Sequence, residues 1–469
     1  MDVRSAAAWF LAALSAAPGV ALAESARVAS FAGHRAIEDP TDVFMFPGLL
    51  FAHADRLHVD FVPSAAEGQA GVNFGSDPIV GVHVGRALLQ HHPRSLVSPT
   101  ARPLDDYDVY SAAIQGVGVA VPPRPGLMAD LLFGLPTGLG ARLTVANAIQ
   151  DVITTPAPPA GGAAPVADPS ICGADETGTE FRTIELGAGW SQRTRERATD
   201  IGGALSLNTV KTVNRGCLAA EGAGTPSLSA AARVAFHLAE RYDLVALAAM
   251  DVRDYDLEFS QLPGKTEASL MGVTVSLGPR MRLSDTVTGA ASVVAGLGLG
   301  SGRDQRGEGA AATSAEASTT AYVLPGIDLS LEADWKEWLK ARAGVLSRYR
   351  IVKVEAERAD RSKTEVVSTA AEHVAAAGVG IHWDEFEVDG AFNVPFLTSG
   401  PDFLGGQAPG VFAELSVSYR WGGAGAAGPS SDAPTYSPIA PPPPAYVPSP
   451  AEPPPPVYDD PNDPYWGPR

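Results

Sequence analysis

The sequence lacks the features that mark several common classes of protein. After residue 23 it has no uninterrupted apolar run of about 18 residues, which excludes transmembrane helices. Basic residues are few, with 34 Lys and Arg against 53 Asp and Glu and a net charge of −19. This balance argues against nucleic acid as a partner, because nucleic acid selects basic surfaces. There is also no Gly-x-Ser-x-Gly, His-Glu-x-x-His or phosphate-loop motif. We therefore assign no catalytic residue, no metal ligand and no cofactor.

Cysteine is scarce as well. The two cysteines, Cys172 and Cys217, lie in Gly-, Pro- and Ala-rich connections that flank two strand-like runs. In an oxidising compartment two cysteines most simply form one disulfide. A metal site would need more ligands than this pair has nearby. We predict a Cys172–Cys217 disulfide, with two free thiols as the alternative.

The beginning of the sequence is typical of a secretory signal peptide. Arg4 supplies a positive charge, residues 6–20 form a short apolar region, and Ala21-Leu22-Ala23 is a small-x-small cleavage site. No cysteine follows this site, so a lipid anchor is not expected. We expect residues 1–23 to be removed and the rest of the chain to leave the cytoplasm.

Residues 56–421 alternate between apolar and polar side chains in runs separated by turn formers. Alternation with period 2 is the pattern of strands that have one apolar and one polar face. The runs have the length of tilted crossings of an outer membrane, about 9–11 residues, whereas strands of soluble proteins average about 5–6. We predict an all-β fold, an antiparallel transmembrane β-barrel of about 14 strands, within a range of about 12–16. A secreted soluble sandwich is the alternative.

The hairpin at residues 321–352 has the clearest pattern. Val323, Ile327 and Leu329 share an apolar face, and the opposite face is acidic on the first arm and basic on the second. One antiparallel register sets Asp334 beside Lys340 and Glu332 beside Arg342, and such pairs contribute about 0.2–1 kcal/mol each. Charges cannot face lipid, where Arg or Lys costs about 2–4 kcal/mol, so they must line a lumen or face water. The lumen-lining candidates are Arg233, His237, Asp328, Glu332, Asp334, Lys340, Arg342, Arg348 and Arg350.

The segment GVFAELSVSYRW, residues 410–421, alternates strictly and ends in two aromatic residues. It resembles the closing-strand signal of bacterial outer-membrane β-barrels. Glu414, Tyr419 and Trp421 match that signal, whereas Ser416 replaces the usual glycine and the chain continues beyond Trp421. An ordinary half-buried strand is the alternative.

The segment EDPTDVFMFPGLL, residues 38–50, resembles the N-terminal motif of the FadL-type outer-membrane transporters. Asp39, Thr41, Val43, Phe44 and Pro47 match the motif, whereas Phe46 stands where the family has asparagine. The resemblance implies a small hatch inside the barrel, over residues 24–55, that gates a hydrophobic cargo. A proline-punctuated loop with hydrophobic anchors is the alternative.

Residues 422–469 are rich in proline and cannot bury a core, so we predict a disordered tail. The alternative is a periplasmic spacer that touches the cell wall or a periplasmic partner.

These patterns predict a protein of the outer membrane of a Gram-negative bacterium, inserted into the lipid bilayer by the barrel-assembly machinery. The leading hypothesis is a channel or transporter for small molecules, polar or hydrophobic, with hydrophobic ones implied by the FadL resemblance. A non-transporting structural or surface-anchored barrel is the first alternative, and a narrow lumen packed by paired charges would favour it. An outer-membrane enzyme is the second. It would need a Ser–His pair, and His237 and His382 lie on polar faces without an identifiable serine partner.

Overall fold

The structure is a computed structural model that describes residues 25–62, 67–85, 127–153, 176–214, 218–259, 264–306, 313–357, 362–392 and 412–421. All of these residues belong to one compact unit. Three predictions fall outside the described residues: the signal peptide at 1–23, the Cys172–Cys217 disulfide and the proline-rich tail at 422–469.

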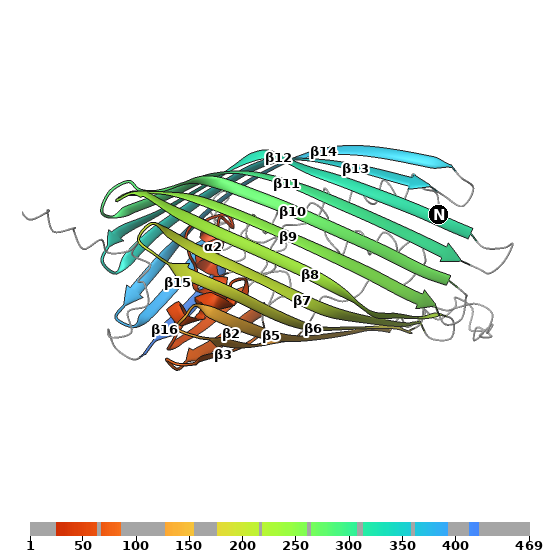
Figure 1. The fold of residues 1–469 in the computed structure, drawn as a ribbon, viewed down its shortest axis with the longest axis horizontal. Helices are drawn as coiled ribbons and strands as arrows, with labels where there is room; N and C mark the ends of the chain where they lie inside the picture. The colour runs from red at the N-terminus through yellow and green to blue at the C-terminus, as the bar shows by residue number, and fades with distance from the viewer. Residues whose placement is uncertain are drawn as a thin grey trace, which may run out of the picture. The chain divides into compact units, whose positions relative to one another are not determined.

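Sixteen antiparallel strands form a closed barrel, in which β1 pairs with β16 and every other pairing joins strands adjacent in sequence (Figure 1). The predicted all-β barrel is confirmed, with a strand number at the upper end of the expected range. The strands are β1 (Arg56–Val62), β2 (Glu67–Phe74), β3 (Ile79–Val84), β4 (Leu127–Gly134), β5 (Leu139–Ile153), β6 (Glu176–Arg193), β7 (Arg197–Asn214), β8 (Leu218–Ala239), β9 (Tyr242–Phe259), β10 (Gly264–Arg282), β11 (Val287–Arg306), β12 (Thr313–Lys336), β13 (Leu339–Glu357), β14 (Lys363–Trp383), β15 (Phe386–Phe392) and β16 (Phe412–Arg420).

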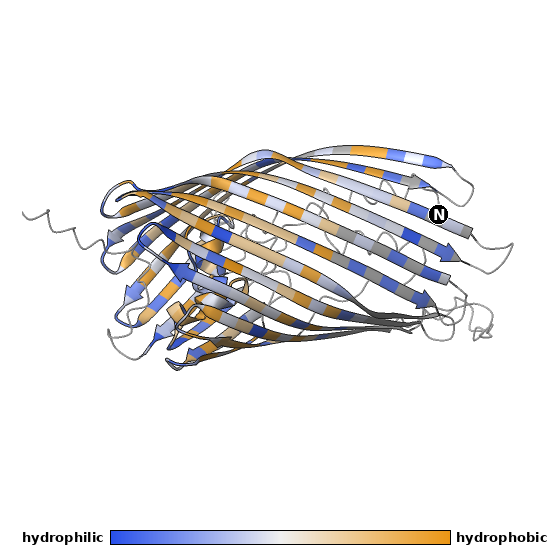
Figure 2. Cartoon of the chain, in the orientation of Figure 1, coloured by the Kyte–Doolittle hydropathy of each residue, from blue (hydrophilic) through white to orange (hydrophobic). Residues whose placement is uncertain are grey.

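Apolar and polar residues alternate along the strands (Figure 2), and the apolar ones of the long strands include many exposed side chains, which form an outer belt, as the alternation predicts. On β10, Val275 is 49% exposed and faces outward, whereas its neighbours Thr274 and Ser276 are buried on the inner side. A closed barrel satisfies every strand hydrogen bond internally, so its apolar outer face can lie against lipid. The molecule is therefore a transmembrane barrel, and such barrels belong to the outer membrane of Gram-negative bacteria.

The two ends of the barrel are distinguished by their connections. Every described connection between consecutive strands lies at one end, and each is short, for example residues 194–196, 240–241 and 384–385. Short turns mark the periplasmic side of outer-membrane barrels. Exposed aromatic side chains gather at this end, with Trp335 at 72% and Trp383 at 75% exposed, as expected where a barrel meets the membrane interface. We therefore take this end as periplasmic.

The hairpin of β12 and β13 has the register that its charges predicted: Glu332 lies opposite Arg342 and Asp334 opposite Lys340. The prediction for Val323 on the same hairpin was wrong. Val323 faces the lumen and is 5% exposed, whereas Ile327 faces outward and is 54% exposed. The reason is a β-bulge between Leu324 and Ile327, in which one extra residue reverses the alternation.

Inside the barrel lie the helical elements that precede β1. They are α2 (Ala26–Ser30) and the 3₁₀ helices η1 (Pro40–Phe44) and η2 (Pro47–His53). No helix within the described residues is long and apolar enough to cross a membrane. α2 contacts β13, β14, β15 and β16, and η2 contacts the wall from β3 to β7. We call residues 25–54 the plug; it lies at the periplasmic end of the barrel (Figure 1, red).

Candidate functional site

The plug is built from short helices that are capped by their own side chains. Ser25 caps α2, with its Oγ accepting a hydrogen bond from the Val28 N–H at 3.2 Å. Asp39 caps η1, and its Oδ1 accepts from the Thr41 N–H at 2.9 Å and from the Thr41 hydroxyl at 2.6 Å. Asp42 completes a capping box by accepting from the Asp39 N–H at 3.1 Å. Asp39 and Thr41 of the FadL-like motif therefore have a local folding role.

The apolar residues of the plug pack against the wall with almost no gap. Phe44, Phe46, Leu49 and Leu50 are buried, as is Val43. The wall provides glycines where the plug backbone touches it: a Cβ atom at Gly140 would collide with the carbonyl of Pro47. Gly202 beside the Met45 carbonyl and Gly344 beside Phe31 act in the same way. Small residues in the strands thus set where the plug seats.

A first arginine cluster ties α2 to one side of the wall. It consists of Arg27, Arg56 and Arg342 with Glu332, Glu387 and Asp389. Arg27 Nη2 lies 3.2 Å from Glu332 Oε1, and Arg342 Nε donates to Glu332 Oε2 at 2.6 Å. Arg342 also donates to Asp389, and Arg56 donates to Glu387 at 2.9 Å. Burial lowers the pKa of the Arg27 guanidinium, but the carboxylates of Glu332 and Asp39 outweigh it and raise that pKa above its usual value.

A second arginine cluster ties the middle of the plug to the wall at β6–β8. It consists of Arg35, Arg193 and Arg233 with Glu38, Asp42 and Asp200. The carboxylate of Asp42 is fully buried and bridges Arg35 at 2.7 Å and Arg233 at 2.5 Å. Arg233 continues to Asp200 at 2.9 Å, and Arg193 joins Asp200 at 2.7 Å and Glu38 at 2.9 Å. Each cluster pairs three guanidinium groups with three carboxylates, so the buried charges balance.

Burial raises the pKa of the Asp39 carboxyl, but the Arg27 guanidinium and the hydrogen bonds from Thr41 outweigh it and bring that pKa to about 2. His34 lies between two wall serines, with Nδ1 2.9 Å from Ser330 Oγ and Nε2 3.0 Å from Ser292 Oγ. Burial, together with the nearby Arg348 guanidinium, lowers the pKa of His34 to about 4. The imidazole is therefore neutral at neutral pH, and the two hydroxyls can donate to one ring nitrogen and accept from the other.

The structure places the predicted lumen-lining residues in four settings. Arg233, Glu332 and Arg342 contact the plug or its clusters directly, as described above. Arg348 pairs with Asp328 beside His34, and His237 pairs with Asp243 at 2.7 Å near the periplasmic end. Asp334 and Lys340 form a partly exposed pair at 3.5 Å close to the turn of the hairpin. Arg350 lies further from the periplasm, opposite Val323 in the register.

The closing strand also holds the plug. The side chains of Glu414, Ser416 and Ser418 on β16 face inward. Tyr419 lies on the outer face, where its ring is tilted against that of Phe386 with 4.6 Å between the ring centroids. Trp421 follows the strand, and its backbone N–H donates a hydrogen bond to the backbone carbonyl of Asp55. Ser416, which departs from the usual glycine, accepts a hydrogen bond from the Ala26 N–H at 2.7 Å. Its hydroxyl therefore fixes the start of α2, a function that glycine lacks.

Phe46 departs from the FadL motif in a similar way. The family places asparagine here, but Phe46 is fully buried and the Arg233 guanidinium lies 5.2 Å above its ring. A cation over an aromatic face gains electrostatic stabilisation. The polar contacts of this part of the plug are made by Asp42 instead.

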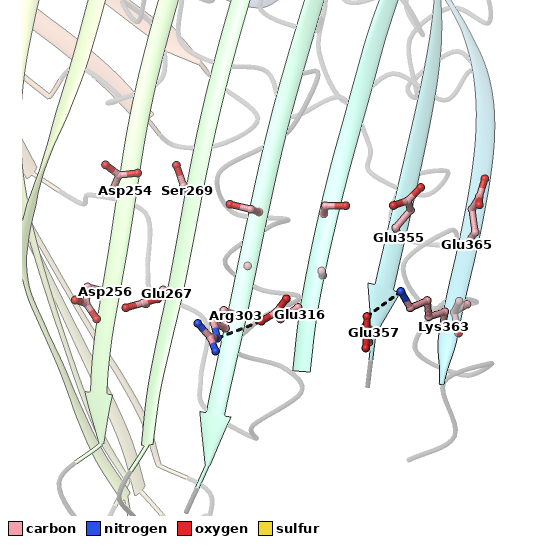
Figure 3. A pocket seen from close by; sticks show the side chains of 15 residues that line it. Asp254, Asp256, Glu267, Ser269, Arg303, Glu316, Glu355, Glu357, Lys363 and Glu365 are labelled. Atoms are coloured by element: carbon pink, nitrogen blue, oxygen red, sulfur yellow. Dashed lines mark ion pairs between the residues drawn. The ribbon is translucent and has the colours of Figure 1, made fainter. Parts of the chain in front are cut away.

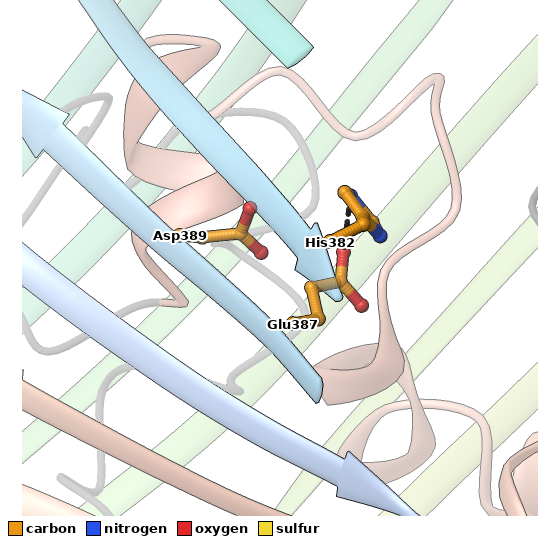
Figure 4. A group of neighbouring side chains, drawn as sticks. All are labelled: His382, Glu387 and Asp389. Carbon is orange, nitrogen blue, oxygen red and sulfur yellow. Dashed lines mark ion pairs between the residues drawn. The ribbon is translucent and has the colours of Figure 1, made fainter. Parts of the chain in front are cut away.

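Three side chains of the periplasmic rim, His382, Glu387 and Asp389, offer ligand atoms within 4.8 Å of one another (Figure 4). This spacing alone would allow a metal ion. However, Arg342 and Arg56 already hold the two carboxylates, and Lys340 lies on the neighbouring strand. Guanidinium groups so close would repel a cation. We therefore assign these carboxylates to the first arginine cluster.

A serine–histidine–aspartate chain does occur, but on β1 and β16 rather than at His237 or His382. Ser418 Oγ lies 3.3 Å from His58 Nδ1, and His58 Nε2 lies 2.8 Å from Asp60 Oδ2. Arg56 donates to the same Ser418 oxygen at 2.9 Å, and all three residues of the chain are buried. The chain joins the first strand to the last, so we assign it to the seam of the barrel and to no reaction.

Above the plug, four apolar side chains face inward on β12 and β13, next to Arg350. Ala321 and Val352 face each other across the two strands and are buried, and Val354 packs against them. Val323 joins them because the bulge turns it inward. We call these four residues the inner apolar patch. Strict alternation does not predict it, because it depends on the extra residue at Pro325-Gly326.

Several residues of the site were not predicted from the sequence, notably Arg27, Arg56, Asp42 and Asp200. Asp42 lies within the FadL-like segment, and Arg56 and Asp200 lie on strands at inward-facing positions, so parity alone could have indicated them. Their partners could not be predicted in this way, because Asp42 and Arg233 are 191 residues apart in the chain.

No protein-family model matches this chain, and no curated protein matches it. Among solved structures it is similar to the toluene transporter TodX of Pseudomonas putida, at 9% identity and a TM-score of 0.36 over 85% of this chain and 98% of TodX. It is similar to the toluene transporter TbuX of Ralstonia pickettii at 7% identity and a TM-score of 0.36, over 85% of this chain and 99% of TbuX. With the siderophore receptor PiuA of Acinetobacter baumannii it shares 7% identity at a TM-score of 0.33, over 56% of this chain and only 46% of PiuA. TodX and TbuX belong to the FadL family, whose N-terminal motif residues 38–50 resemble.

Proposed function

We propose that this chain is an outer-membrane channel that admits small, largely apolar molecules, with the plug closing its periplasmic end. The inner apolar patch is the observation that carries the proposal. Lumens of general porins are polar, because they hold water. A lumen that turns Ala321, Val323 and Val352 inward instead favours solutes that leave water readily.

The plug gives the channel a barrier that has to be displaced. Two balanced arginine clusters hold it, and its apolar residues fill the space beside the wall. A solute that passes the patch meets α2, which lies against β13 and β14. Release of solute to the periplasm therefore requires part of the plug to move.

The test uses intact cells, since apolar molecules cross simple lipid vesicles unaided. The full chain is expressed in a Gram-negative host, and entry is followed for N-phenylnaphthylamine, an apolar dye, and for nitrocefin, a polar β-lactam. We expect faster entry of the dye and unchanged entry of nitrocefin. Ala321→Asp with Val352→Asp should reduce the gain about tenfold or more, because two carboxylates directly opposite each other in an apolar site cost more than about 1.4 kcal/mol.

Ala321→Val with Val352→Leu is the matched control, because it keeps the patch apolar, and it should retain dye entry. All variants must show the same heat-modifiable band on gels, which reports a folded barrel. Faster entry of nitrocefin but not of the dye would contradict the apolar preference and would favour a general porin.

A structural barrel that transports nothing is the second candidate. It is favoured by the packing at the plug, where the cavity between Phe44, Met45 and Pro47 and the wall is only about 10 Å³. The same experiment distinguishes the two, since a structural barrel leaves the entry of both probes unchanged.

A further inference from the structure

Three polar or aromatic side chains lie together on the outer face of the barrel, within the apolar belt. Ser347 of β13 and His373 of β14 are direct partners in the register, and Ser347 Oγ lies 3.0 Å from His373 Nδ1 on the exposed side of the sheet. The ring of Tyr349, also exposed, lies edge-on to that of His373 with 6.0 Å between the ring centroids. We call Ser347, Tyr349 and His373 the outer polar cluster.

The outer polar cluster lies at the depth of lipid. On the extracellular side, the outer face becomes charged at Glu355 of β13 and Glu365 of β14, which lie opposite each other (Figure 3). On the periplasmic side, β14 ends at the exposed Trp383. His373 is about midway between Glu365 and Trp383, and its row continues across β13 to the exposed Ile327 on β12. Polar side chains therefore occupy the outer face where the rest of the belt is apolar.

At this depth the polar atoms of the cluster need partners, because hydrocarbon offers no hydrogen bond. A neutral histidine ring has one N–H donor and one acceptor nitrogen. Ser347 satisfies Nδ1 of His373, but within the described residues neither Nε2 of His373 nor the hydroxyl of Tyr349 has a hydrogen-bond partner. An ionisable side chain in the membrane that lacks a partner indicates a functional contact. The missing partner must come from another molecule in the membrane.

The surface beside the cluster allows such a molecule to come close. On the periplasmic side of the cluster, the next two outward rows carry Ala343 on β13 and Ala375 and Ala377 on β14. On β12 the same two rows carry Leu329 and Leu331, whose side chains project from the belt. Small residues let neighbouring membrane-embedded elements approach each other closely. The polar atoms of the cluster are therefore within reach of a second protein wall, which larger side chains would keep away.

We propose that the outer face of β13 and β14 binds a second copy of this chain, with the outer polar cluster at the centre of the contact. Two copies related by a two-fold axis along the membrane normal present the same groups at the same depth, because the same belt fixes both barrels. The cluster is complementary to itself: with the proton on Nδ1, His373 donates to Ser347, and Nε2 accepts from the hydroxyl of the partner's Tyr349. The symmetry forms this bond twice. The proposal does not depend on transport, because the contact lies outside the lumen.

The first test is crosslinking in the outer membrane of intact cells, with the full chain carrying Cys172→Ser and Cys217→Ser. Ala375→Cys places a thiol beside the cluster, and a short bismaleimide should link it into a product of twice the mass of one chain. Leu277→Cys is the matched control: Leu277 is equally exposed and belongs to the row of His373, but it lies on β10, so this variant should stay unlinked. Equal linking of both variants or of neither would overturn the proposal, as would a product of another mass.

The second test measures the dissociation constant of the dimer by sedimentation in mild detergent. Tyr349→Phe with His373→Leu should raise this constant about tenfold or more, because both symmetric hydrogen bonds are lost. The barrel itself should keep its heat-modifiable band, since both changes make the lipid-facing surface more apolar. Leu277→Phe, a change of similar size in the same belt, should leave the constant unaltered. A dimer that the double variant does not weaken would overturn the role of the cluster, and an unaltered chain that sediments as a monomer would overturn the proposal altogether.

Discussion

The periplasmic and extracellular halves of this barrel place their charges on opposite sides of the same strands. At the periplasmic end, arginines and carboxylates face inward and pair between plug and wall, while the outer face is apolar. At the extracellular end of β9–β14 the charges stand on the outer face, and the inner face of β12 and β13 carries the inner apolar patch.

The comparison shows that the surroundings, and not the strand, decide which face is polar. Within the membrane the outer face meets lipid, so polar groups can only point inward. Beyond the belt the outer face meets headgroups and water, and apolar side chains can then turn inward. Because side chains alternate with period 2, one strand can meet both demands along its length.

The largest effect is expected at Asp42, which holds the inner charges of the periplasmic half together. Asp42→Asn leaves Arg35 and Arg233 without their shared carboxylate, and breaking a buried pair in this way costs about 3–5 kcal/mol. The barrel should stay intact while the plug loosens. Hydrogen exchange of plug peptides and single-channel conductance would detect this. Glu38→Gln, at the exposed edge of the same cluster, should change both much less; equal protection in Asp42→Asn and the unaltered protein would contradict the assigned role.

The same charge placed at two heights on β11 compares the outer faces directly. Leu297→Arg puts a guanidinium in the lipid belt, where it costs about 2–4 kcal/mol at mid-depth and less near the interface. Ser301→Arg puts it further toward the extracellular end of the same strand, near the outward-facing ion pair of Arg303 and Glu316. There we expect a change of about 0–1 kcal/mol. Urea unfolding in lipid vesicles measures both. A similar cost at the two positions would mean that the belt does not end where the register indicates.

Two buried histidines of the plug make its attachment depend on pH: burial lowers the pKa of His34 to about 4 and that of His53 to about 3. His34 gives the part that acts nearest to neutral pH. Its pKa is about 4 in the fold against 6.5 for a free histidine, so the released plug binds more protons between these two values. The plug should therefore be fully held above about pH 6.5 and weaken as the pH falls toward 4, with about 3 kcal/mol of the loss due to His34. Conductance recorded over this range should rise on acidification. His34→Gln should keep the hydrogen bonds to Ser292 and Ser330 and reduce this dependence to the part that belongs to His53.

The smallest effect is expected for the pair of Asp334 and Lys340, which lies inside the barrel but is partly exposed at its periplasmic rim. Asp334→Asn should cost less than about 1 kcal/mol, since solvent screens such pairs. Unfolding in urea with and without high salt is the measurement. A loss of stability comparable to that expected for Asp42→Asn would show that solvent is excluded from the rim as fully as from the contact between plug and wall.

Local alternation was sufficient for much of the fold. The inward position of Arg233, Asp328 and Arg342, the register of β12 with β13, and the closing role of β16 all follow from side-chain parity and from opposite charges on adjacent arms. The strand number was less certain, because β1, β3 and β15 have only 7, 6 and 7 residues and give short patterns.

The sequence by itself determined a transmembrane barrel and the face of nearly every strand, because lipid imposes a strict alternation that each strand displays locally. Only the tertiary structure decided how the plug is held. Asp42 pairs with Arg233, 191 residues away in the chain, and Ser416 bonds to Ala26, 390 residues away. No local pattern predicts such contacts. The bulge before Ile327 belongs to the same class, because a single unpaired residue becomes visible only when the neighbouring strands fix the register. Closure of the barrel brings these groups together, and it thereby forms the contacts of the plug and the inner apolar patch.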